Sequence, residues 1–393
     1  MAKRAALTGN EAVALAMKQI NPDVVAAYPI TPQTEIVQYF ASFVADGEVS
    51  TEMVRVESEH SAMSATIGAA AAGARSMTAT SSQGLALMHE MLHIASSYRL
   101  PIVMPVVNRA LSGPINIHCD HSDSMNARDT GWIQLYCENA QEAYDNVFIA
   151  MRIAERPDVL TPVMVCFDGF IISHSLENLE VEDDEAVKGF VAEYEPDMYL
   201  LNSRKPYTMG PLAMFDYYFE IKRQQAEVMF NAKAAIQEVS SAYGKLTGRD
   251  YGLFETYKLD DAELGIVIIG STAGTARAAV DHLRAKGIKA GLLKLRVFRP
   301  VPREEVVAAI KHLKAVAVMD RADSFGGFGG PLFSELRGWM YGSDATTAVV
   351  NYVYGLGGRD VVMGDILTVY DYLEKLVNDR APLELVQYLG VRE

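Results

Sequence analysis

The sequence predicts an α/β protein with parallel sheets, and two observations carry this prediction. Short apolar runs alternate with helix-length segments in both halves of the chain, an order typical of parallel strands joined by right-handed crossovers. Half of the 393 residues are hydrophobic, so the chain can build a core in each of two or three domains. We expect a doubly wound parallel sheet followed by a smaller C-terminal α/β domain.

The first half of the chain predicts strands that each lead into a turn, a helix or a loop. Residues 23–27 form the first predicted strand, and the sequence Tyr28-Pro29-Ile30-Thr31-Pro32 follows it as a sharp turn. Thr31 is predicted to cap the next helix, with Pro32 at the first helical position. The further predicted elements are strands at 52–56, 76–80, 101–107 and 163–167 and helices at 59–72 and 83–97.

The second half opens with a long connector, from about residue 175 to 263. It starts with an acidic run at 180–185, predicted to be a solvated loop, and contains a long helical pattern at 215–243. We expect the connector to wrap a surface or reach a partner. The first domain is assigned to residues 1–240, connector included, and the second to 264–393, with strands at 265–270, 290–295 and 315–319.

Composition excludes several classes of function. The formal net charge of −15 argues against nucleic acid and anionic membranes as partners. Three cysteines are too few for a disulfide scaffold or for an iron–sulfur cluster held by this chain alone. The N-terminus lacks the apolar core of a signal peptide, and the apolar runs are too short to span a bilayer. We therefore expect a soluble cytoplasmic protein.

Two groups of potential metal ligands have simpler explanations. The segment from His89 to His93 matches the zinc-protease pattern HExxH, but no third His follows, and a helix whose histidines meet water or a partner chain is favoured. His118, Cys119, Asp120, His121 and Asp123 crowd one loop, yet their spacing matches no standard zinc site. A polar loop over an active site explains them equally well.

Two glycine-rich segments follow predicted strands, at 270–274 and 326–330. Backbone N–H groups in such turns can cradle a phosphate. Neither segment fits a dinucleotide-binding or P-loop pattern, so tight turns that pack helices onto a sheet are favoured.

Four polar features follow strands of one predicted sheet and should line the same edge of it. They are Thr31, Glu59, the turn at 80–84 and Arg109. Glu59 could cap its helix, or its carboxylate could form a strong hydrogen bond to a heterocyclic nitrogen of a ligand. Arg109 could bind a carboxylate or lie in a solvated loop. Ligands of open α/β sheets bind at this edge, and this set suits a small anionic substrate.

The motifs in this order resemble the pyruvate:ferredoxin oxidoreductase family, among the thiamine-diphosphate-dependent 2-oxoacid:ferredoxin oxidoreductases. In the first domain the resemblance rests on residues 28–32, 57–59, 81–85, 109–112, 120–123 and 128–131. In the second it rests on residues 296–300, 320–321, 326–331 and 355–360, which look like the α subunit of the multi-subunit form. The resemblance implies a pyrimidine-binding sheet and a C-terminal domain of the transketolase type.

The resemblance also implies roles for individual residues. Glu59 would bond N1′ of the thiamine aminopyrimidine, and Tyr28, Pro29, Ile30, Ser82 and Gln83 would line the cofactor. Thr31 and Arg109 would bind the oxo and carboxylate groups of the substrate. Thr31 favours pyruvate over oxalate as that substrate, because a cation near this position would be expected for oxalate. The implied reaction is the reversible oxidative decarboxylation of pyruvate with coenzyme A to acetyl-CoA and carbon dioxide, with electrons passing to ferredoxin.

The chain lacks part of what this chemistry needs. The Gly-Asp-Gly motif with a following Asn, which holds Mg²⁺ and the diphosphate, is absent; Gly364-Asp365-Ile366 lacks its second Gly. The resemblance places Mg²⁺, the diphosphate half and [4Fe–4S] clusters on partner β, γ and δ subunits. Cys119 stands where the family pattern leads us to expect Gly. Two alternatives stay open: the same chemistry on branched-chain 2-oxoacids, 2-oxoglutarate or oxalate, and a non-catalytic scaffold subunit.

Overall fold

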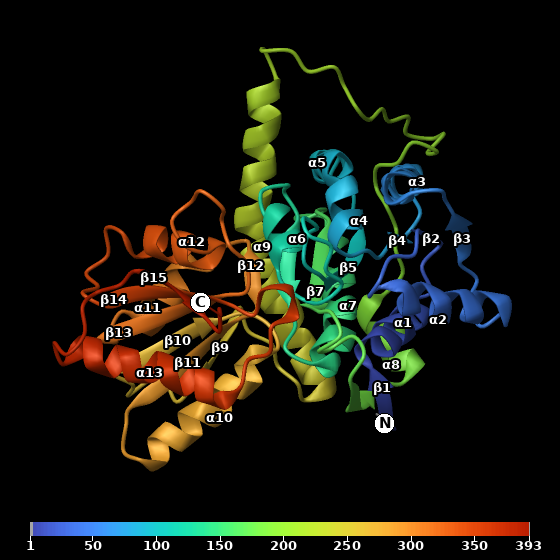
Figure 1. Ribbon diagram of the computed structural model, residues 1–393. Helices are drawn as coiled ribbons and strands as arrows, with labels where there is room; N and C mark the ends of the chain where they lie inside the picture. Colours follow the sequence, from blue (N-terminus) through green and yellow to red (C-terminus); the bar gives the residue numbers. More distant parts are fainter. Residues whose placement is uncertain (1–2, 393) are drawn as a thin grey trace.

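The computed structural model describes residues 3–392, and its largest sheet lies in the first half of the chain (Figure 1). The strand order is β12-β6-β7-β5-β4-β2-β3. The pairs from β6 to β3 are parallel, whereas β12 runs antiparallel to β6, so the predicted α/β class is confirmed. The strands are β2 (Val24–Ala27), β3 (Glu52–Arg55), β4 (Ser76–Met77), β5 (Val103–Asn108), β6 (Ile133–Tyr136), β7 (Val163–Asp168) and β12 (Val297–Arg299).

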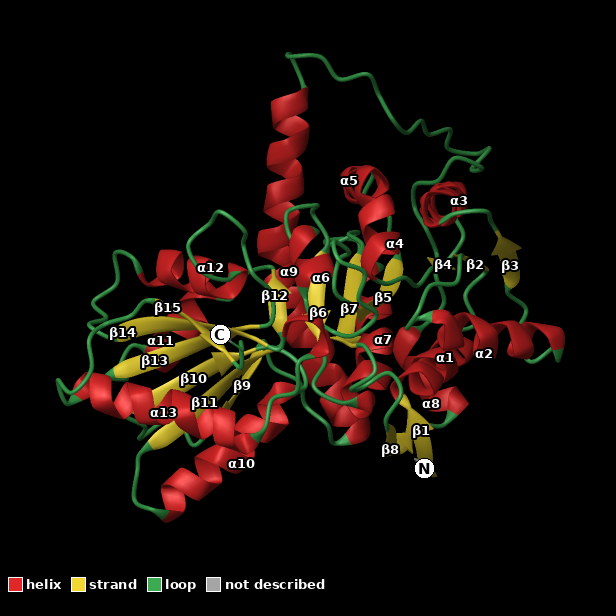
Figure 2. Cartoon of the chain, in the orientation of Figure 1, coloured by secondary structure: helices red, strands yellow, loops and turns green. Residues whose placement is uncertain are grey.

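Helices cover both faces of this sheet, as Figure 2 shows. One layer contains α1 (Gly9–Ile20), α2 (Thr34–Ala45), α7 (Ala140–Ala154) and α8 (Asp184–Val191). The other contains α3 (Glu59–Ala72), α4 (Ser82–Leu87) and α5 (His89–Ser97). The predicted helix at 83–97 is thus two helices, which meet at Met88.

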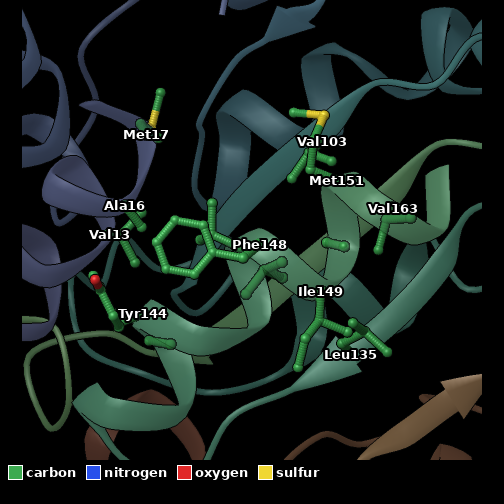
Figure 3. Packing of buried hydrophobic residues seen from close by; sticks show 14 of the residues in the cluster. Val13, Ala16, Met17, Val103, Leu135, Tyr144, Phe148, Ile149, Met151 and Val163 are labelled. Carbon is green, nitrogen blue, oxygen red and sulfur yellow. The ribbon is translucent and has the colours of Figure 1, made fainter. Parts of the chain in front are cut away.

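The core of the first sheet forms between α1, α7 and the strands (Figure 3). Met17 from α1, Phe148 from α7 and Val103 from β5 are buried there, and each such side chain stabilises the fold by roughly 1.5–3 kcal/mol. Helix α7 is buried along almost its whole length, including its polar Glu142 and Asp145. Those two carboxylates are paired with cations from later segments, which ties the second half of the chain to the first.

The second sheet has the order β15-β14-β13-β10-β11-β9 and is parallel except for β9, which pairs antiparallel with β11. Helices α10 (Thr272–Ala285) and α13 (Met363–Val377) cover one face, and α11 (Arg303–Ile310) and α12 (Pro331–Met340) cover the other. The strands are β9 (Phe254–Tyr257), β10 (Leu264–Ile268), β11 (Ala290–Leu295), β13 (Ala315–Asp320), β14 (Ala348–Tyr354) and β15 (Val386–Leu389).

The connector is more ordered than predicted. Its acidic run is not a solvated loop: Glu180 belongs to β8 (Leu176–Val181), which pairs with β1 (Lys3–Thr8), and Glu182 is buried. Arg249 pairs with both carboxylates, which explains how Glu182 tolerates burial, whereas residues 183–185 are exposed. Residues 193–217 have no helix or strand, and they lead into α9 (Tyr218–Thr247), whose first turns project from the body of the molecule (Figure 1).

None of the helices within residues 3–392 combines the length and the hydropathy that a bilayer crossing requires.

Candidate active site

The turn after β2 is held by two buried amide side chains. The backbone N–H of Ile30 donates to Gln33 Oε1 at 3.2 Å, and Gln33 Nε2 donates to the Ala79 carbonyl at 3.0 Å. Asn10 Nδ2 donates to the Pro32 carbonyl at 2.8 Å. Because Gln33 is drawn inward, helix α2 begins only at Thr34, and the predicted helix cap at Thr31 is wrong. The Thr31 side chain is exposed.

Arg109, at the end of β5, reaches this turn. Its side chain is only 6% exposed. Nη1 donates to the Thr31 carbonyl at 2.8 Å, and Nε donates to the Asn116 carbonyl at 2.9 Å. Nη2 makes no hydrogen bond to residues 3–392. Burial lowers the pKa of Arg109 and Asp123 opposes this, but a guanidinium stays charged, so the free Nη2 is a fixed cationic donor.

Glu59 is the first residue of α3, where the carboxylate benefits from the helix dipole. The cap itself is Ser58, whose hydroxyl accepts from the Ser61 N–H at 3.2 Å. Glu59 is 8% exposed, and no group within residues 3–392 forms a hydrogen bond with its carboxylate. Neither carboxylate oxygen is among the fully buried polar atoms of the described residues that lack a partner, so the carboxylate reaches solvent and is free to accept a hydrogen bond from a ligand.

The turn at 80–84 forms the surface against which Glu59 lies. A Cβ on Gly84 would come within 2.9 Å of Glu59 Oε1 and 2.4 Å of Thr80 Oγ1, so the close approach requires glycine. The Thr80 hydroxyl is buried and has no partner within the described residues. Glu59, Thr80 and Gly84 therefore form one small polar cluster at the sheet edge.

Ser82 and Gln83 complete the turn. Ser82 has a φ of 44°, a left-handed conformation that costs a non-glycine residue roughly 1–3 kcal/mol. Its N–H donates to Asp123 Oδ2 at 2.9 Å, and its hydroxyl donates to the Ala110 carbonyl at 2.6 Å. Gln83 is half-buried, and its side-chain amide lies 2.7 Å from the Ser82 hydroxyl oxygen. These contacts connect the turn to the segment that carries Arg109.

The structure thus brings most of the predicted residues to one edge. Thr31 and Arg109 are in contact, and Ser82 and Gln83 adjoin the Arg109 segment. No hydrogen bond within the described residues joins Glu59 to Thr31 or Arg109. Tyr28 is half-buried and Pro29 is exposed.

Several supporting residues could not be predicted from the sequence. Asn10, Gln33 and Asn116 fix the positions of Thr31 and Arg109, and nothing in their local sequence marks them. In the sequence, Asp123 stands out as a potential metal ligand, as part of a polar loop and as part of the motif at 120–123, but its contacts with the Ser82 and Arg109 backbones could not be predicted. Its place directly after a polar loop that follows a strand was the available signal.

The polar loop at 118–123 meets the second sheet instead of forming an isolated metal site. Cys119, His121 and Asp168 place their ligand atoms within 4.8 Å of one another. However, His121 Nε2 lies 2.7 Å from Asp168 Oδ1, and Arg321 Nη1 lies 3.0 Å from Oδ2. Burial raises the pKa of Asp168, but His121 and Arg321 outweigh it and hold that pKa below its ordinary value. Asp168 is therefore an ionised link between the two sheets.

The glycine-rich segments are tight turns in which some of the N–H groups are already bonded. In the first, the Ser271 N–H donates to Asp168 Oδ2 at 3.1 Å. In the second, the Gly327 N–H donates to the Ser324 carbonyl at 2.7 Å, and the Gly330 N–H donates to Asn351 Oδ1 at 2.8 Å. These N–H groups are therefore occupied within the protein.

The histidines of the HExxH match lie on the outer side of α5. The rings of His89 and His93 stand edge to face, with centroids 5.2 Å apart. His93 is exposed and His89 is half-buried. They belong to neither of the groups of potential metal ligands that occur within residues 3–392.

Comparisons with known proteins agree with this geometry. The family model described as "Pyruvate flavodoxin/ferredoxin oxidoreductase, thiamine diP-bdg" matches residues 15–241, and "Pyruvate:ferredoxin oxidoreductase core domain II" matches residues 262–366. Pyruvate synthase subunit PorA of Thermotoga maritima is 55% identical over 100% of this chain and 99% of its own length. Ketoisovalerate oxidoreductase subunit VorA of Pyrococcus furiosus is 46% identical over 98% of each chain.

A solved structure supports the same fold. The 2-oxoglutarate:ferredoxin oxidoreductase from Magnetococcus marinus superposes with a TM-score of 0.74 and 22% identity. The match covers 94% of this chain and 65% of that longer chain.

Proposed function

Because this chain belongs to the pyruvate flavodoxin/ferredoxin oxidoreductase family, we propose that it is the α subunit of a pyruvate:ferredoxin oxidoreductase. The complex converts pyruvate and coenzyme A to acetyl-CoA and carbon dioxide, reversibly, and passes the electrons to ferredoxin. The observation that carries this proposal is the pairing of Arg109 with the Thr31 carbonyl, which leaves Nη2 free for a carboxylate.

Arg109 binds and orients the substrate. A guanidinium suits the planar carboxylate of a 2-oxoacid, and the Thr31 and Asn116 carbonyls hold this one in place. The Thr31 hydroxyl, exposed beside it, is placed to donate to the 2-oxo group. Together the two residues fix a short 2-oxoacid by both of its polar ends.

The residues around Glu59 fit the aminopyrimidine of thiamine diphosphate. The carboxylate of Glu59, which has no hydrogen-bond partner within the described residues, would bond ring atom N1′, and the missing Cβ of Gly84 lets Glu59 lie close against the turn at 80–84. Tyr28, Pro29, Ile30, Ser82 and Gln83 would line the cofactor. Thiamine diphosphate, when bound, supplies the carbanion chemistry at the 2-oxo carbon. We assign the diphosphate and its Mg²⁺ to a partner subunit, because the sequence has no Gly-Asp-Gly motif with a following Asn to hold them.

The site is therefore shared between subunits. A β subunit provides the diphosphate half and a [4Fe–4S] cluster, with small γ and δ subunits beside it, and electrons pass through the partner subunits to ferredoxin. The complex works in the cytoplasm, without nucleic acid or membrane partners. We assign residues 1–240 to the pyrimidine-binding domain with its connector and residues 264–393 to the second domain, with β12 returning to the first sheet and β9 adding to the second.

A panel of 2-oxoacids tests this function. The complex is purified from its native source, its subunits are identified, and the coenzyme A-dependent reduction of a low-potential viologen dye is measured. We expect the highest kcat/KM for pyruvate, compared with 2-oxoisovalerate, 2-oxoglutarate and oxalate. A complex that uses one of the other acids and not pyruvate would contradict the substrate assignment. A complex with no 2-oxoacid activity would leave the chain as a scaffold.

A further inference from the structure

Asp123 joins three separate segments of the candidate site. Its carboxylate is 2% exposed and accepts two hydrogen bonds on each oxygen. Oδ2 accepts from the N–H groups of Ser82 and Arg109, at 2.9 and 3.0 Å. Oδ1 accepts from Asn108 Nδ2 and from the Ser124 N–H, at 2.8 and 2.7 Å. The donors come from the start of α4, the end of β5 and α6 (Ser122–Asn126).

All four donors to Asp123 are uncharged. Burying a carboxylate without a cation is costly, and burial raises the pKa of Asp123 to about 6 although the four donors oppose it. A carboxylate is nonetheless the group that fits, because both of its oxygens only accept. An asparagine would turn an NH₂ group toward two N–H donors or lose the acceptor on one side.

We propose that Asp123 is the positioning residue that sets Arg109 to receive the substrate carboxylate, an inference that rests on the proposed function. Asp123 fixes the Arg109 backbone, and the Thr31 and Asn116 carbonyls then fix its guanidinium. These bonds fix the position of Nη2 at the sheet edge beside Thr31. The same carboxylate also accepts from the N–H of Ser82, which has a left-handed conformation. Asp123 therefore fixes both Arg109 and the turn beside Glu59.

The test uses Asp123→Asn in the complete complex. A displacement of about 1 Å in a positioning group can cost roughly 100-fold, so we expect the KM for pyruvate to rise about tenfold or more while kcat changes less. The Kd of oxamate, an unreactive analogue with the same carboxylate, should rise by a similar factor in calorimetry. Asp320→Asn is the matched control, since Asp320 is also buried and held by uncharged donors; it should lose stability but keep the wild-type KM.

Two results would overturn the proposal: an assembled Asp123→Asn complex with wild-type KM and oxamate affinity, or equal KM changes in both Asp variants. If Asp123→Asn does not assemble, Asn108→Ala decides, because it removes one donor and leaves the carboxylate in place. It should raise the KM by a smaller factor, and an unchanged KM would again overturn the proposal. A wild-type complex without pyruvate activity would instead refute the proposed function.

Discussion

Arg109 and Thr31 are joined by a hydrogen bond of 2.8 Å between Nη1 and the Thr31 carbonyl oxygen. The two residues follow β5 and β2, which are not neighbours in the sheet because β4 lies between them. The bond therefore spans the end of the intervening strand β4, beyond which the turn at 80–84 follows. It brings residues from the ends of β2 and β5 together at this edge of the sheet.

Arg109→Ala should mainly weaken the use of substrate. Losing a charge-assisted hydrogen bond typically costs about 1.5–3 kcal/mol, so kcat/KM for pyruvate should fall by roughly 10- to 150-fold. Arg109→Lys keeps the charge but cannot keep the bonds to both the Thr31 and Asn116 carbonyls, and it should give a partial loss. Steady-state kinetics of the assembled complexes check this, and an unchanged kcat/KM for Arg109→Ala would exclude Arg109 as the carboxylate ligand.

Gly84→Ala should disturb Glu59. The added Cβ would lie 2.8 Å from Glu59 Cγ, and overpacking of this kind costs about 1–3 kcal/mol. We expect a lower thermal midpoint and a large loss of activity. Gly68→Ala on the exposed side of α3 is the control, because its Cβ meets nothing within 4 Å and alanine favours a helix by up to about 1 kcal/mol. Equal behaviour of the two variants would show that the contact between Gly84 and Glu59 is unimportant.

The order of strands and helices was predictable because its signals are local. Helix α3 was predicted at Glu59–Ala72 and is found there, since a strand, a cap and a small-residue helix follow one another directly. The convergence of Thr31, Ser82 and Arg109 followed from the rule that parallel strands end at one edge.

Other features depend on contacts between distant residues. Glu182 is buried because Arg249, 67 residues away, pairs with it, and no local pattern shows that pairing. Likewise, Gln33 stands at the cap position of α2 in place of Thr31, and its side chain donates to the carbonyl of Ala79, which follows β4. The return of β12 from the second half to pair with β6 of the first sheet is also a long-range event.

Asp320 should give the protein a pH-dependent stability. Burial raises its pKa from 3.8 to about 7, against the hydrogen bonds from Leu332, Phe333 and Asn351. The folded protein therefore binds a proton that the unfolded chain has released, and the contribution of Asp320 falls as the pH rises through this window. In thermal unfolding from pH 5 to pH 8, the midpoint of Asp320→Asn should rise relative to the midpoint of the wild type as the pH rises. A difference that stays constant with pH would contradict the shifted pKa.

The chain expressed alone should be colourless and inactive. It has three cysteines, all buried, whereas a [4Fe–4S] cluster needs four thiolates. Absorbance near the cluster bands and the pyruvate-dependent reduction of a dye check this expectation. A brown and active preparation of the single chain would refute the division of the site between subunits.

Glu59→Gln in the assembled complex tests the central claim most directly. Glutamine keeps the size of the side chain but cannot hold the proton at N1′, so pyruvate-dependent reduction of a low-potential acceptor should be lost while assembly and thermal stability persist. Glu57→Gln is the matched control: its exposed carboxylate bonds only to Ser61 within the described residues, and it should retain wild-type activity. Activity near the wild-type level in Glu59→Gln would contradict the assignment of this chain as the half of the site that holds the aminopyrimidine.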